Sequence, residues 1–447
     1  MPRLPDAPRL LPAHAAILPA WILLASCGHL GIDLEGTSNA STQTGGASSS
    51  TGGTSDAGGA GTDGSGAGGG VGTGGAGNAT STGGAAGDGG SSSGGGTAAG
   101  GSSNSGGSGG TDGSSGDENC GGITDVDFGL VGWAAEGSGT TGGQDGTTEV
   151  AWSGSQLLEL LVSKDPGTPL TIRVVSTITP ENTGDDKVDV ADVKDVTIVG
   201  QGDQGVFDGI GLRVIRASNI ILRNLHIHHV NTGELDSVGL AGPADHIWVD
   251  HCEFDAEFQG AAKGTYDGLI DAKGTVAYVT YSWNYIHDTW NPLLVGSEEM
   301  DKSDRKLTMH HNRIENVDSG APSYRGGNGH IFNNVYKDVA TIAINTRIKA
   351  CLRIENNVFE NAINPWASAF SPSLGAVDVQ CNDLDDASVF DFSSPDISMA
   401  ETCEATIPYD YADFLTETGS VATVVTENAG FDKLDDPEDY WQGRRWN

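Results

Sequence analysis

Six short segments in the second half of the chain repeat one pattern, in which a polar corner is followed by a bulky apolar residue. When the segments are aligned, the last column holds only apolar or aromatic residues: Ile227, Phe254, Ile286, Ile314, Tyr336 and Phe359. Two places earlier, the last four segments carry an asparagine: Asn284, Asn312, Asn334 and Asn357. Successive segments are roughly 22 to 32 residues apart, which lies within the range of repeat proteins.

This repeat predicts an all-β fold, a right-handed parallel β-helix. In such a fold, equivalent residues of adjacent coils lie about 4.8 Å apart. An apolar column then stacks inside the tube, and a column of asparagines can form a hydrogen-bonded ladder. A lone asparagine in a turn usually bonds to its local backbone, but four in one column favour the ladder. A β-sandwich or a propeller would show neither this column nor such irregular loop lengths.

The region before the repeat contains one amphipathic helix, expected at residues 156–162, where leucines are spaced to cover one face. Apolar runs typical of strands follow it at residues 170–175, 193–199, 212–215 and 220–227. We therefore expect one large β domain to span residues 119–447, and we expect that domain to be a monomer.

The first 26 residues are typical of an export signal. An apolar stretch at residues 15–26 follows two arginines and is too short to span a bilayer. It ends in Leu24-Ala25-Ser26-Cys27, which resembles the lipobox of bacterial lipoproteins, where the cysteine is lipidated and becomes the mature N-terminus. The resemblance implies a secreted or cell-envelope protein, lipid-anchored to the bacterial outer membrane through Cys27. An ordinary signal peptide with an accidental cysteine is the alternative.

Residues 27–118 are nearly all Gly, Ser, Thr, Ala and Asp. Such a segment cannot bury enough apolar surface to offset its ordering entropy, so we expect a disordered linker. A linker of this length has a root-mean-square span on the order of 50 Å. It would let the folded domain stand clear of its membrane.

The net charge of −37 restricts the partners of the chain. It argues against nucleic acid and against anionic membrane surfaces, because both require a basic patch. The lipid anchor is then the only membrane contact that we expect. A polyanionic substrate would also be repelled unless a metal cation stood between it and the protein. Solubility alone is the simpler explanation of the acidity.

The chain has six cysteines, and the five that follow Cys27 leave at least one thiol unpaired. Export makes disulfides permissible. We expect Cys381 to pair with Cys403, because both lie in the irregular C-terminal part. No Cys-x-x-Cys pair occurs, which argues against metal ligation by cysteine.

Two carboxylates, Asp267 and Asp271, flank a glycine turn, and this spacing lets them converge on one ion. Solvated turn acids in an acidic protein are the alternative. Asp250 and His251, in contrast, are more typical of buried corner residues than of catalysts.

Seven segments, in one order along residues 128–365, resemble the family 1 polysaccharide lyases, the pectate and pectin lyases. They are Thr-Thr-Gly-Gly (140–143), Val-Thr-Ile-Val-Gly-Gln-Gly (196–202), Asn-Ile-Ile-Leu-Arg-Asn-Leu (219–225), Ile-Trp-Val-Asp-His (247–251), Asp-Gly-Leu-Ile-Asp (267–271), Gly-His-Ile-Phe-Asn-Asn (329–334) and Asn-Thr-Arg (345–347). No single segment is specific, but their joint occurrence in family order is. The chain after residue 366 shows no such resemblance.

The resemblance implies Ca²⁺-dependent β-elimination on polygalacturonate, an acidic polysaccharide. The proton at C5 lies α to the uronate carboxylate, and the leaving group is the glycosidic oxygen at C4. A cation on the carboxylate stabilises the enolate-like charge, and calcium suits this role because it accepts several oxygen ligands. Carried over by position, the calcium carboxylates of the family fall on Asp236, Asp267 and Asp271, with Glu234 in an outer position.

The sequence departs from the family at two positions. The family base is an arginine two residues before the proline of an Arg-x-Pro-x-x-Arg pattern. Here Gly320 stands two residues before Pro322, although the second arginine is present as Arg325. A substrate-binding lysine that follows a tryptophan in many members is replaced by Asn291, after Trp290. Glycine cannot accept a proton, so the base is missing or relocated.

Several residues are candidates for the roles left open. Arg325 and Arg313 are the nearby arginines that we would test as a relocated base. Arg347 matches a family arginine that positions backbone or substrate. Asn291 and His287 are candidates for substrate contact, and His287 is also a conceivable base near neutral pH, although that corner is structural in the family.

Two functions stay open at this point. The first is a secreted lyase that acts on pectate or a related uronan with an altered base. The second is a catalytically silent β-helix that binds acidic polysaccharide through calcium. A pectin lyase is disfavoured by the retained carboxylates, because a methyl-esterified substrate needs no cation.

Overall fold

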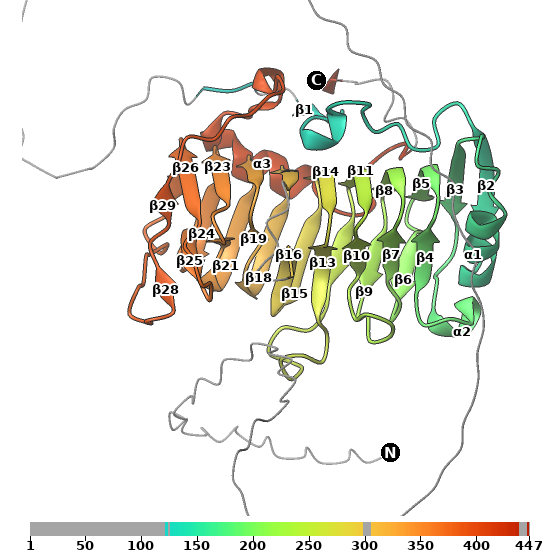
Figure 1. The fold of residues 1–447 in the computed structure, drawn as a ribbon, viewed down its shortest axis with the longest axis horizontal. Helices are drawn as coiled ribbons and strands as arrows, with labels where there is room; N and C mark the ends of the chain where they lie inside the picture. Colours follow the sequence, from blue (N-terminus) through green and yellow to red (C-terminus); the bar gives the residue numbers. More distant parts are fainter. Residues whose placement is uncertain (1–120, 124–125, 298–304, 438–444, 447) are drawn as a thin grey trace, which may run out of the picture. The chain divides into compact units, whose positions relative to one another are not determined.

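The structure is a computed structural model that describes residues 121–123, 126–297, 305–437 and 445–446. Within these ranges the strands stack side by side into a solenoid (Figure 1). The predicted signal peptide, the lipidation site Cys27, the predicted linker and Cys120 lie outside the described residues. No helix in the described ranges is both long and apolar enough to cross a bilayer.

Three sheets run along the solenoid, and in the central part each coil adds one strand to each sheet in turn. The first sheet has eleven strands: β2 (Thr147–Ala151), β3 (Leu170–Val174), β5 (Lys194–Gly200), β8 (Ser218–Arg223), β11 (Ala244–Asp250), β14 (Val276–Ser282), β17 (Lys306–His310), β20 (Asn328–Phe332), β23 (Cys351–Glu355), β26 (Ala376–Gln380) and β29 (Glu401–Thr402). The second has eight: β6 (Val206–Asp208), β9 (His226–His228), β12 (Glu253–Asp255), β15 (Tyr285–Thr289), β18 (Arg313–Ser319), β21 (Val335–Ile342), β24 (Val358–Ala362) and β27 (Asp383–Leu384). The third has nine: β4 (Val188–Ala191), β7 (Leu212–Ile215), β10 (Val238–Ala241), β13 (Gly268–Lys273), β16 (Asn291–Val295), β19 (Ser323–Arg325), β22 (Ile344–Arg347), β25 (Trp366–Ala369) and β28 (Ile397–Ser398). All strand pairs in these sheets are parallel except β25 with β28, so the predicted right-handed parallel β-helix is confirmed.

The remaining elements lie at the ends and on the flanks of the stack. They are α1 (Gly154–Ser163), α2 (Pro180–Thr183), α3 (Thr418–Asn428), the short 3₁₀ helices η1 (Trp133–Ala135) and η2 (Ala412–Phe414), and the antiparallel pair β1 (Val126–Asp127) and β30 (Arg445–Trp446). Helix α1 lies at the β2 end of the stack (Figure 1), where the Ser153 hydroxyl accepts a hydrogen bond from the Gln156 amide. Its buried leucines, Leu157 and Leu161, join the core, which confirms the predicted amphipathic helix.

The aligned columns of the sequence repeat are true neighbours in the structure. The apolar residues that end the six segments are fully buried in one core. Beside them, Asn284 donates a hydrogen bond to Asn312, Asn312 to Asn334, and Asn334 to Asn357, each over 2.9 Å. The ladder runs one rung further than predicted, because Asn357 donates to Asn382 over 2.9 Å. The predicted asparagine ladder is therefore confirmed.

One predicted strand was wrong in its extent. Residues 220–227 were expected to form a single run, but the chain turns at Asn224 and separates β8 from β9. Asn224 adopts φ 52°, and its amide donates to the carbonyl oxygens of Gly200 and Gly202. Asparagine tolerates this left-handed conformation and can bond to nearby backbone, so it makes the corner between two sheets.

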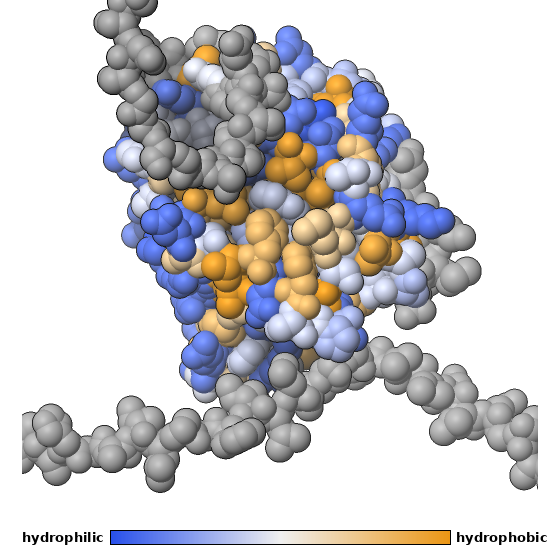
Figure 2. Space-filling view, turned by 90° about the vertical axis from the view of Figure 1, so that its left-hand side faces the viewer, coloured by the Kyte–Doolittle hydropathy of each residue, from blue (hydrophilic) through white to orange (hydrophobic). Residues whose placement is uncertain are grey.

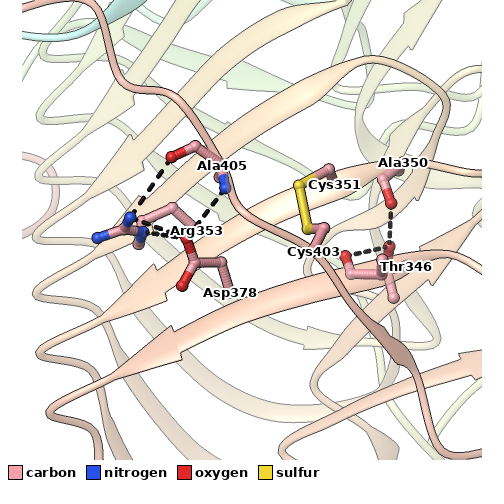
Figure 3. The surroundings of a disulfide bond; sticks show 8 residues. Thr346, Ala350, Cys351, Arg353, Asp378, Cys403 and Ala405 are labelled. Carbon is pink, nitrogen blue, oxygen red and sulfur yellow. Dashed lines mark hydrogen bonds and ion pairs between the residues drawn. A yellow bond between two sulfur atoms is a disulfide. The ribbon is translucent and has the colours of Figure 1, made fainter.

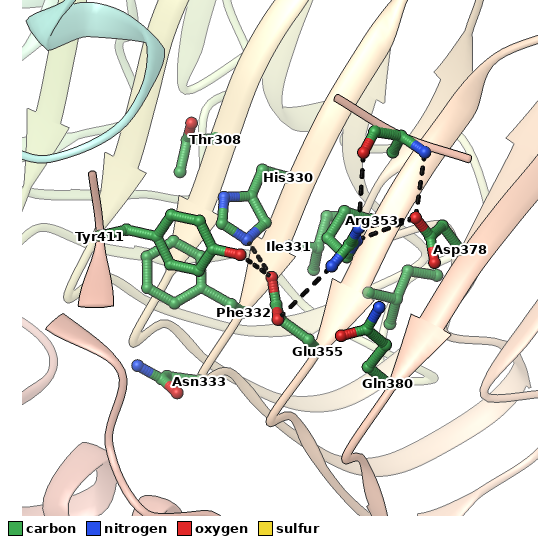
Figure 4. Close-up of polar contacts among 12 residues, drawn as sticks. Thr308, His330, Ile331, Phe332, Asn333, Arg353, Glu355, Asp378, Gln380 and Tyr411 are labelled. Carbon is green, nitrogen blue, oxygen red and sulfur yellow. Dashed lines mark hydrogen bonds and ion pairs between the residues drawn. The ribbon is translucent and has the colours of Figure 1, made fainter. Parts of the chain in front are cut away.

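The C-terminal part of the chain covers the outer face of the first sheet. Its Tyr411 hydroxyl donates to Glu355 over 2.9 Å, and Glu355 in turn lies 2.8 Å from Nε2 of His330 (Figure 4). Burial lowers the pKa of His330, and the hydrogen bond to Glu355 opposes this shift. Arg353 pairs with Asp378 beside this network. The covering segment thus adds a hydrogen bond to a polar network of the first sheet.

A disulfide fixes this covering segment, and it differs from the predicted one. Cys403 is bonded to Cys351 on β23 (Figure 3). The expected pairing of Cys381 with Cys403 was therefore wrong, although Cys381 is itself disulfide-bonded. The irregular C-terminal chain passes beside the first sheet, so its cysteine meets a residue far away in sequence. Cys252 is the free thiol in the described part of the chain, and it is buried.

The β29 end of the stack exposes apolar side chains. Figure 2 looks onto this end and shows hydrophobic residues between polar ones. The exposed large residues that follow β25 are Phe370, Leu374, Val389, Phe390 and Met399.

Candidate active site

Two buried carboxylates and one lysine form the centre of the site on the third sheet. Asp236 lies just before β10, and Asp271 and Lys273 lie on β13. Ile270 and Ala272 point into the core, so the alternation of a strand turns Asp271 and Lys273 outward. Lys273 Nζ lies 2.9 Å from Oδ2 of Asp236 and 2.9 Å from Oδ2 of Asp271. Asp236 and Lys273, 37 positions apart in sequence, thus meet on adjacent coils.

Two glycines leave room for the carboxylates. Gly239 is the β10 residue that pairs with Asp271, and a Cβ built on it would lie 3.3 Å from Oδ2 of Asp236 and 3.5 Å from Oε2 of Glu234. A Cβ on Gly268 would lie only 2.3 Å from Oδ1 of Asp271. Any larger residue at either position would press on the acidic groups. The local sequence therefore preserves an acidic hollow beside Lys273.

The close approach of these charges changes their proton affinities. Burial raises the pKa of Asp236 to about 7, and the charge of Asp271 adds to this rise while Lys273 opposes it. Burial also raises the pKa of Asp271, and Lys273 again opposes the shift. Burial lowers the pKa of Lys273, but the two carboxylates outweigh it and raise that pKa above its ordinary value. One ammonium does not fully compensate two buried carboxylates.

The donor atoms fit a hard divalent cation. Oδ1 of Asp236 is buried and has no hydrogen-bond partner. A buried oxygen of this kind is costly unless a donor or a cation faces it. Asp267 and Glu234 are exposed at the rim, and Glu234 Oε1 bonds to Arg213 over 2.9 Å. An all-oxygen donor set of this kind is the type that calcium prefers.

A basic row continues from the carboxylates along the solenoid. The register of the third sheet pairs Arg325 with Arg347. It also pairs Val295 with Tyr324, so Gly296, the residue after Val295, lies next to Arg325 on the neighbouring coil. Arg325 Nη1 donates to the Gly296 carbonyl, and Arg347 Nη2 donates to the carbonyl of Phe370. At about 4.8 Å per coil, Arg325 lies two coils and Arg347 three coils beyond Lys273. These three residues define what we call the basic row.

Gly320 lies at a turn whose backbone conformation disfavours a side chain. Gly320 has φ +81°, a conformation that L residues rarely adopt, and a Cβ on it would lie 2.3 Å from the Ser323 hydroxyl. Asn291 is exposed at the start of β16, where it pairs with Gly268 beside the acidic hollow. We call the outer face of the third sheet from Asp236 to Arg347 the groove, and Gly320, which lies before β19, supplies no side chain to it.

Arg313 and His287 are not brought to this site. Arg313 lies on β18 and His287 on β15, both in the second sheet, whereas the carboxylates belong to the third. Arg313 forms an ion pair with Glu315 and lies over the ring of Tyr285 at 4.4 Å. The structure therefore does not bring Arg313 or His287 together with the carboxylates, and their predicted roles as base and substrate contact stay predictions. A corner of the coil separates each of them from the groove.

Sequence reasoning missed two cationic residues near the groove. Lys273 has a recognisable signal, because it stands two places after Asp271 in a strand and so shares its face. Lys263 has no such signal, because it lies in the long excursion between β12 and β13. Its Nζ lies 5.3 Å from the centre of the Trp290 ring and 3.0 Å from Oδ2 of Asp318. Only the folded loop places this ammonium beside the Trp290-Asn291 pair.

Comparison with known proteins shows the family to which the chain belongs. A family model described as pectate lyase matches residues 129–434. The chain belongs to the pectate lyase family. The match continues beyond residue 365, where the resemblance had been expected to end, because the later coils and the covering segment are part of the family domain.

Relatives and solved structures place the chain within this pectate lyase family. A pectate trisaccharide-lyase of Bacillus licheniformis is 44% identical over 311 residues, which cover 69% of this chain and 88% of that protein. Pectate lyase A of Emericella nidulans is 33% identical over 312 residues, which cover 68% of this chain and 87% of that protein. The crystal structure of the pectate lyase Bsp165PelA from Bacillus sp. N165, in complex with trigalacturonate, is 32% identical, has a TM-score of 0.63, and covers 69% of this chain and 100% of that one. By family, the protein is therefore a polysaccharide lyase.

Proposed function

We propose that this pectate lyase family member cleaves polygalacturonate by Ca²⁺-dependent β-elimination. The observation that carries the proposal is the buried carboxylate pair, Asp236 and Asp271, in which Oδ1 of Asp236 lacks any hydrogen-bond partner. This pair stands at the start of the basic row on the same sheet. An acidic polysaccharide needs both features in a protein of net charge −37.

The residues would have different roles according to their positions on the sheet. Asp236, Asp271 and, from the rim, Asp267 and Glu234 would hold calcium. When bound, calcium would neutralise a uronate carboxylate and stabilise the negative charge that develops as the C5 proton leaves. The basic row would bind further carboxylates of the polymer, one or more coils away. Lys263 is placed to contact the substrate beside Trp290, where the family lysine is missing.

Arg325 is the residue that we assign as the base. It lies in the groove, and the buried guanidinium of Arg305 is close enough for the two positive charges to oppose each other. Burial lowers the pKa of Arg305, and Arg325 lowers it further. Arg325 is held at this position by its hydrogen bond to the Gly296 carbonyl.

The direct test uses the full chain with Ca²⁺ and polygalacturonate. We expect a rise in absorbance at the unsaturated-uronide band, and we expect EDTA to abolish it. Asp271→Asn should abolish it as well, because the amide cannot supply the charge. The matched control is Asp192→Asn, an exposed carboxylate next to β4 that is paired with Arg216. Calcium-dependent retention on a pectate gel without any absorbance rise would instead select a silent binding protein.

A second experiment asks whether an arginine at position 320 is a better base than Arg325. Gly320→Arg combined with Ser323→Ala removes the hydroxyl that a side chain at Gly320 would meet at 2.3 Å. We expect a rate gain of several powers of ten if the rest of the groove is intact. Gly320→Ala with Ser323→Ala carries the same backbone strain, costing about 1–2 kcal/mol, but has no guanidinium. An equal rate for the two double variants would show that a guanidinium at position 320 adds nothing to Arg325 as the base.

A further inference from the structure

A cluster of histidines and carboxylates lies on the second sheet, away from the candidate active site. His226 lies on β9, Glu253 and Asp255 on β12, and His287 on β15. The parallel register pairs His226 with Glu253, and Asp255 with His287. Their side chains share the outer face of the sheet and are 13–25% exposed. Three consecutive coils therefore present four potential metal ligands at one place.

The ligand atoms converge closely. His226 Nε2 lies 2.6 Å from Oδ2 of Asp255, and His287 Nε2 lies 3.3 Å from Oε1 of Glu253 and 4.0 Å from Oδ2 of Asp255. One ligand atom each of His226, Glu253 and Asp255 lies within 4.8 Å of the others. Ligands about 2.0–2.2 Å from a tetrahedral ion are themselves about 3.3 Å apart. Small side-chain adjustments would thus suffice to admit an ion.

A second observation points to the same use of His287. Its other ring nitrogen, Nδ1, lies 2.7 Å from Oδ2 of Asp288, and Oδ1 of Asp288 accepts a hydrogen bond from Asn316. The His287 ring is also stacked on Tyr285, with ring centres 3.9 Å apart. A carboxylate behind a histidine fixes the tautomer and directs the free nitrogen at a metal. Here it directs Nε2 toward Glu253 and Asp255.

The donor chemistry distinguishes this cluster from the calcium carboxylates. Two imidazoles with two carboxylates suit zinc and similar divalent transition ions, whereas calcium prefers oxygen ligands alone. Asp208, His228 and His229 form a neighbouring trio. There the two imidazoles bond to each other through their Nδ1 atoms, 2.8 Å apart, and no carboxylate orients them from behind in the described structure. The trio is therefore the weaker candidate.

We propose that His226, Glu253, Asp255 and His287 bind one divalent transition-metal ion, with zinc the preferred ion, and that Asp288 is the positioning residue behind His287. The ion would join three consecutive coils on the sheet that lies away from the groove. The competing explanation is an ion-pair ladder, because acids and bases alternate along this face from Asp208 to Lys337. A ladder of that kind predicts no specific metal binding.

The test measures zinc on the full chain after chelation and removal of the chelator. We expect one equivalent of Zn²⁺ to remain after dialysis and to raise Tm, and Co²⁺ to give the visible absorption of a tetrahedral site. His226→Gln with His287→Gln should abolish both signals. Asp288→Asn leaves all four ligands in place and should weaken zinc binding by about 10–100-fold.

Two controls separate this site from other histidines. His246→Gln removes an imidazole whose Nδ1 also bonds to an aspartate, Asp245, but on the first sheet, and it should leave zinc binding unchanged. His228→Gln tests the neighbouring trio and should also leave it unchanged. The proposal is overturned if the native protein retains no zinc. It is also overturned if the variant with both His226→Gln and His287→Gln still binds zinc. A calcium-dependent lyase assay plays no part in this outcome.

Discussion

At the scale of single residues, the proposed calcium site depends most on Asp236. Its carboxyl is 4% exposed, it faces Asp271, and the bond to Lys273 occupies only one of its two oxygens. Two buried carboxylates that face each other are unfavourable unless a cation binds between them, because like charges that are shielded from water repel each other. The same imbalance makes the group sensitive to protons, which compete with a metal for the same oxygen.

This competition predicts how calcium binding depends on pH. With a pKa raised to about 7, Asp236 must lose a proton before it can bind calcium at lower pH. Apparent calcium affinity should therefore fall about tenfold for each pH unit below about 7, and level off above it. Calorimetric titration at pH 6 and pH 8.5 measures this directly. Equal affinity at the two values would argue against Asp236 as a ligand.

The raised pKa of Asp236 also predicts the stability of the calcium-free protein. The folded state holds this proton more tightly than the unfolded chain, so the group stabilises the fold at low pH and loses that effect as pH rises toward about 7. Asp236→Asn should therefore stabilise the calcium-free protein at pH 8, by about 2–4 kcal/mol, while it removes the stabilisation by calcium. Urea unfolding with and without Ca²⁺ gives both values. The Asp192→Asn variant, at an exposed position, should change neither.

At the scale of elements, the asparagine ladder holds the coils in register. Asn334 is fully buried, and its amide donates to the carbonyl oxygens of Met309 and Phe332 as well as to Asn357. Its own oxygen accepts from the backbone amide of Asn312. Every polar atom of this side chain is therefore used. Its bonds to Met309, Asn312 and Asn357 join the corner between the first and second sheets to the neighbouring coils, and its bond to Phe332 lies within its own coil.

Removing one inner rung should be expensive. Asn334→Ala leaves several buried donors and acceptors without partners, so we expect a loss of about 2–4 kcal/mol in the free energy of unfolding. Asn382 ends the ladder at a partly exposed position, where water can replace a lost partner, so Asn382→Ala should cost less than half as much. Urea unfolding midpoints compare the two variants. Equal costs would show that position in the ladder does not matter.

At the scale of the whole molecule, the C-terminal segment protects the outer face of the first sheet. It brings Tyr411 to Glu355, and its Cys403 is bonded to Cys351 across a sequence separation of 52 residues. The disulfide closes a long loop, and closing such a loop restricts the unfolded chain. The disulfide should therefore contribute to the stability of the folded domain as a whole.

Cys351→Ser with Cys403→Ser tests this contribution. For a loop of this length we expect a loss of about 4 kcal/mol in the free energy of unfolding, although strain in the folded state can reduce it. Reductant is a poorer test, because Cys381 is also disulfide-bonded. Thermal unfolding of the double variant under oxidising conditions isolates the single bond. An unchanged Tm would show that hydrogen bonds alone hold the segment.

The sequence by itself determined the fold and part of the site. The asparagine and apolar columns follow from the repeat, because each coil must place one apolar residue in the tube beside the last. The sequence also predicted that Asp267 and Asp271 can approach one ion, because both lie within a single turn and strand around Gly268. The prediction that Cys27 is lipidated rests on the sequence alone.

Only the tertiary structure decided which distant residues share a face. Arg313 and Arg325 are close in the chain, yet a corner sends them to the second and third sheets. Asp236 and Lys273 are far apart in the chain, yet adjacent coils bring them to 2.9 Å. The same holds for the pairing of Cys351 with Cys403, and for the four ligands of the second sheet. Coil lengths vary from one turn to the next, so the face on which a residue ends up depends on every loop before it.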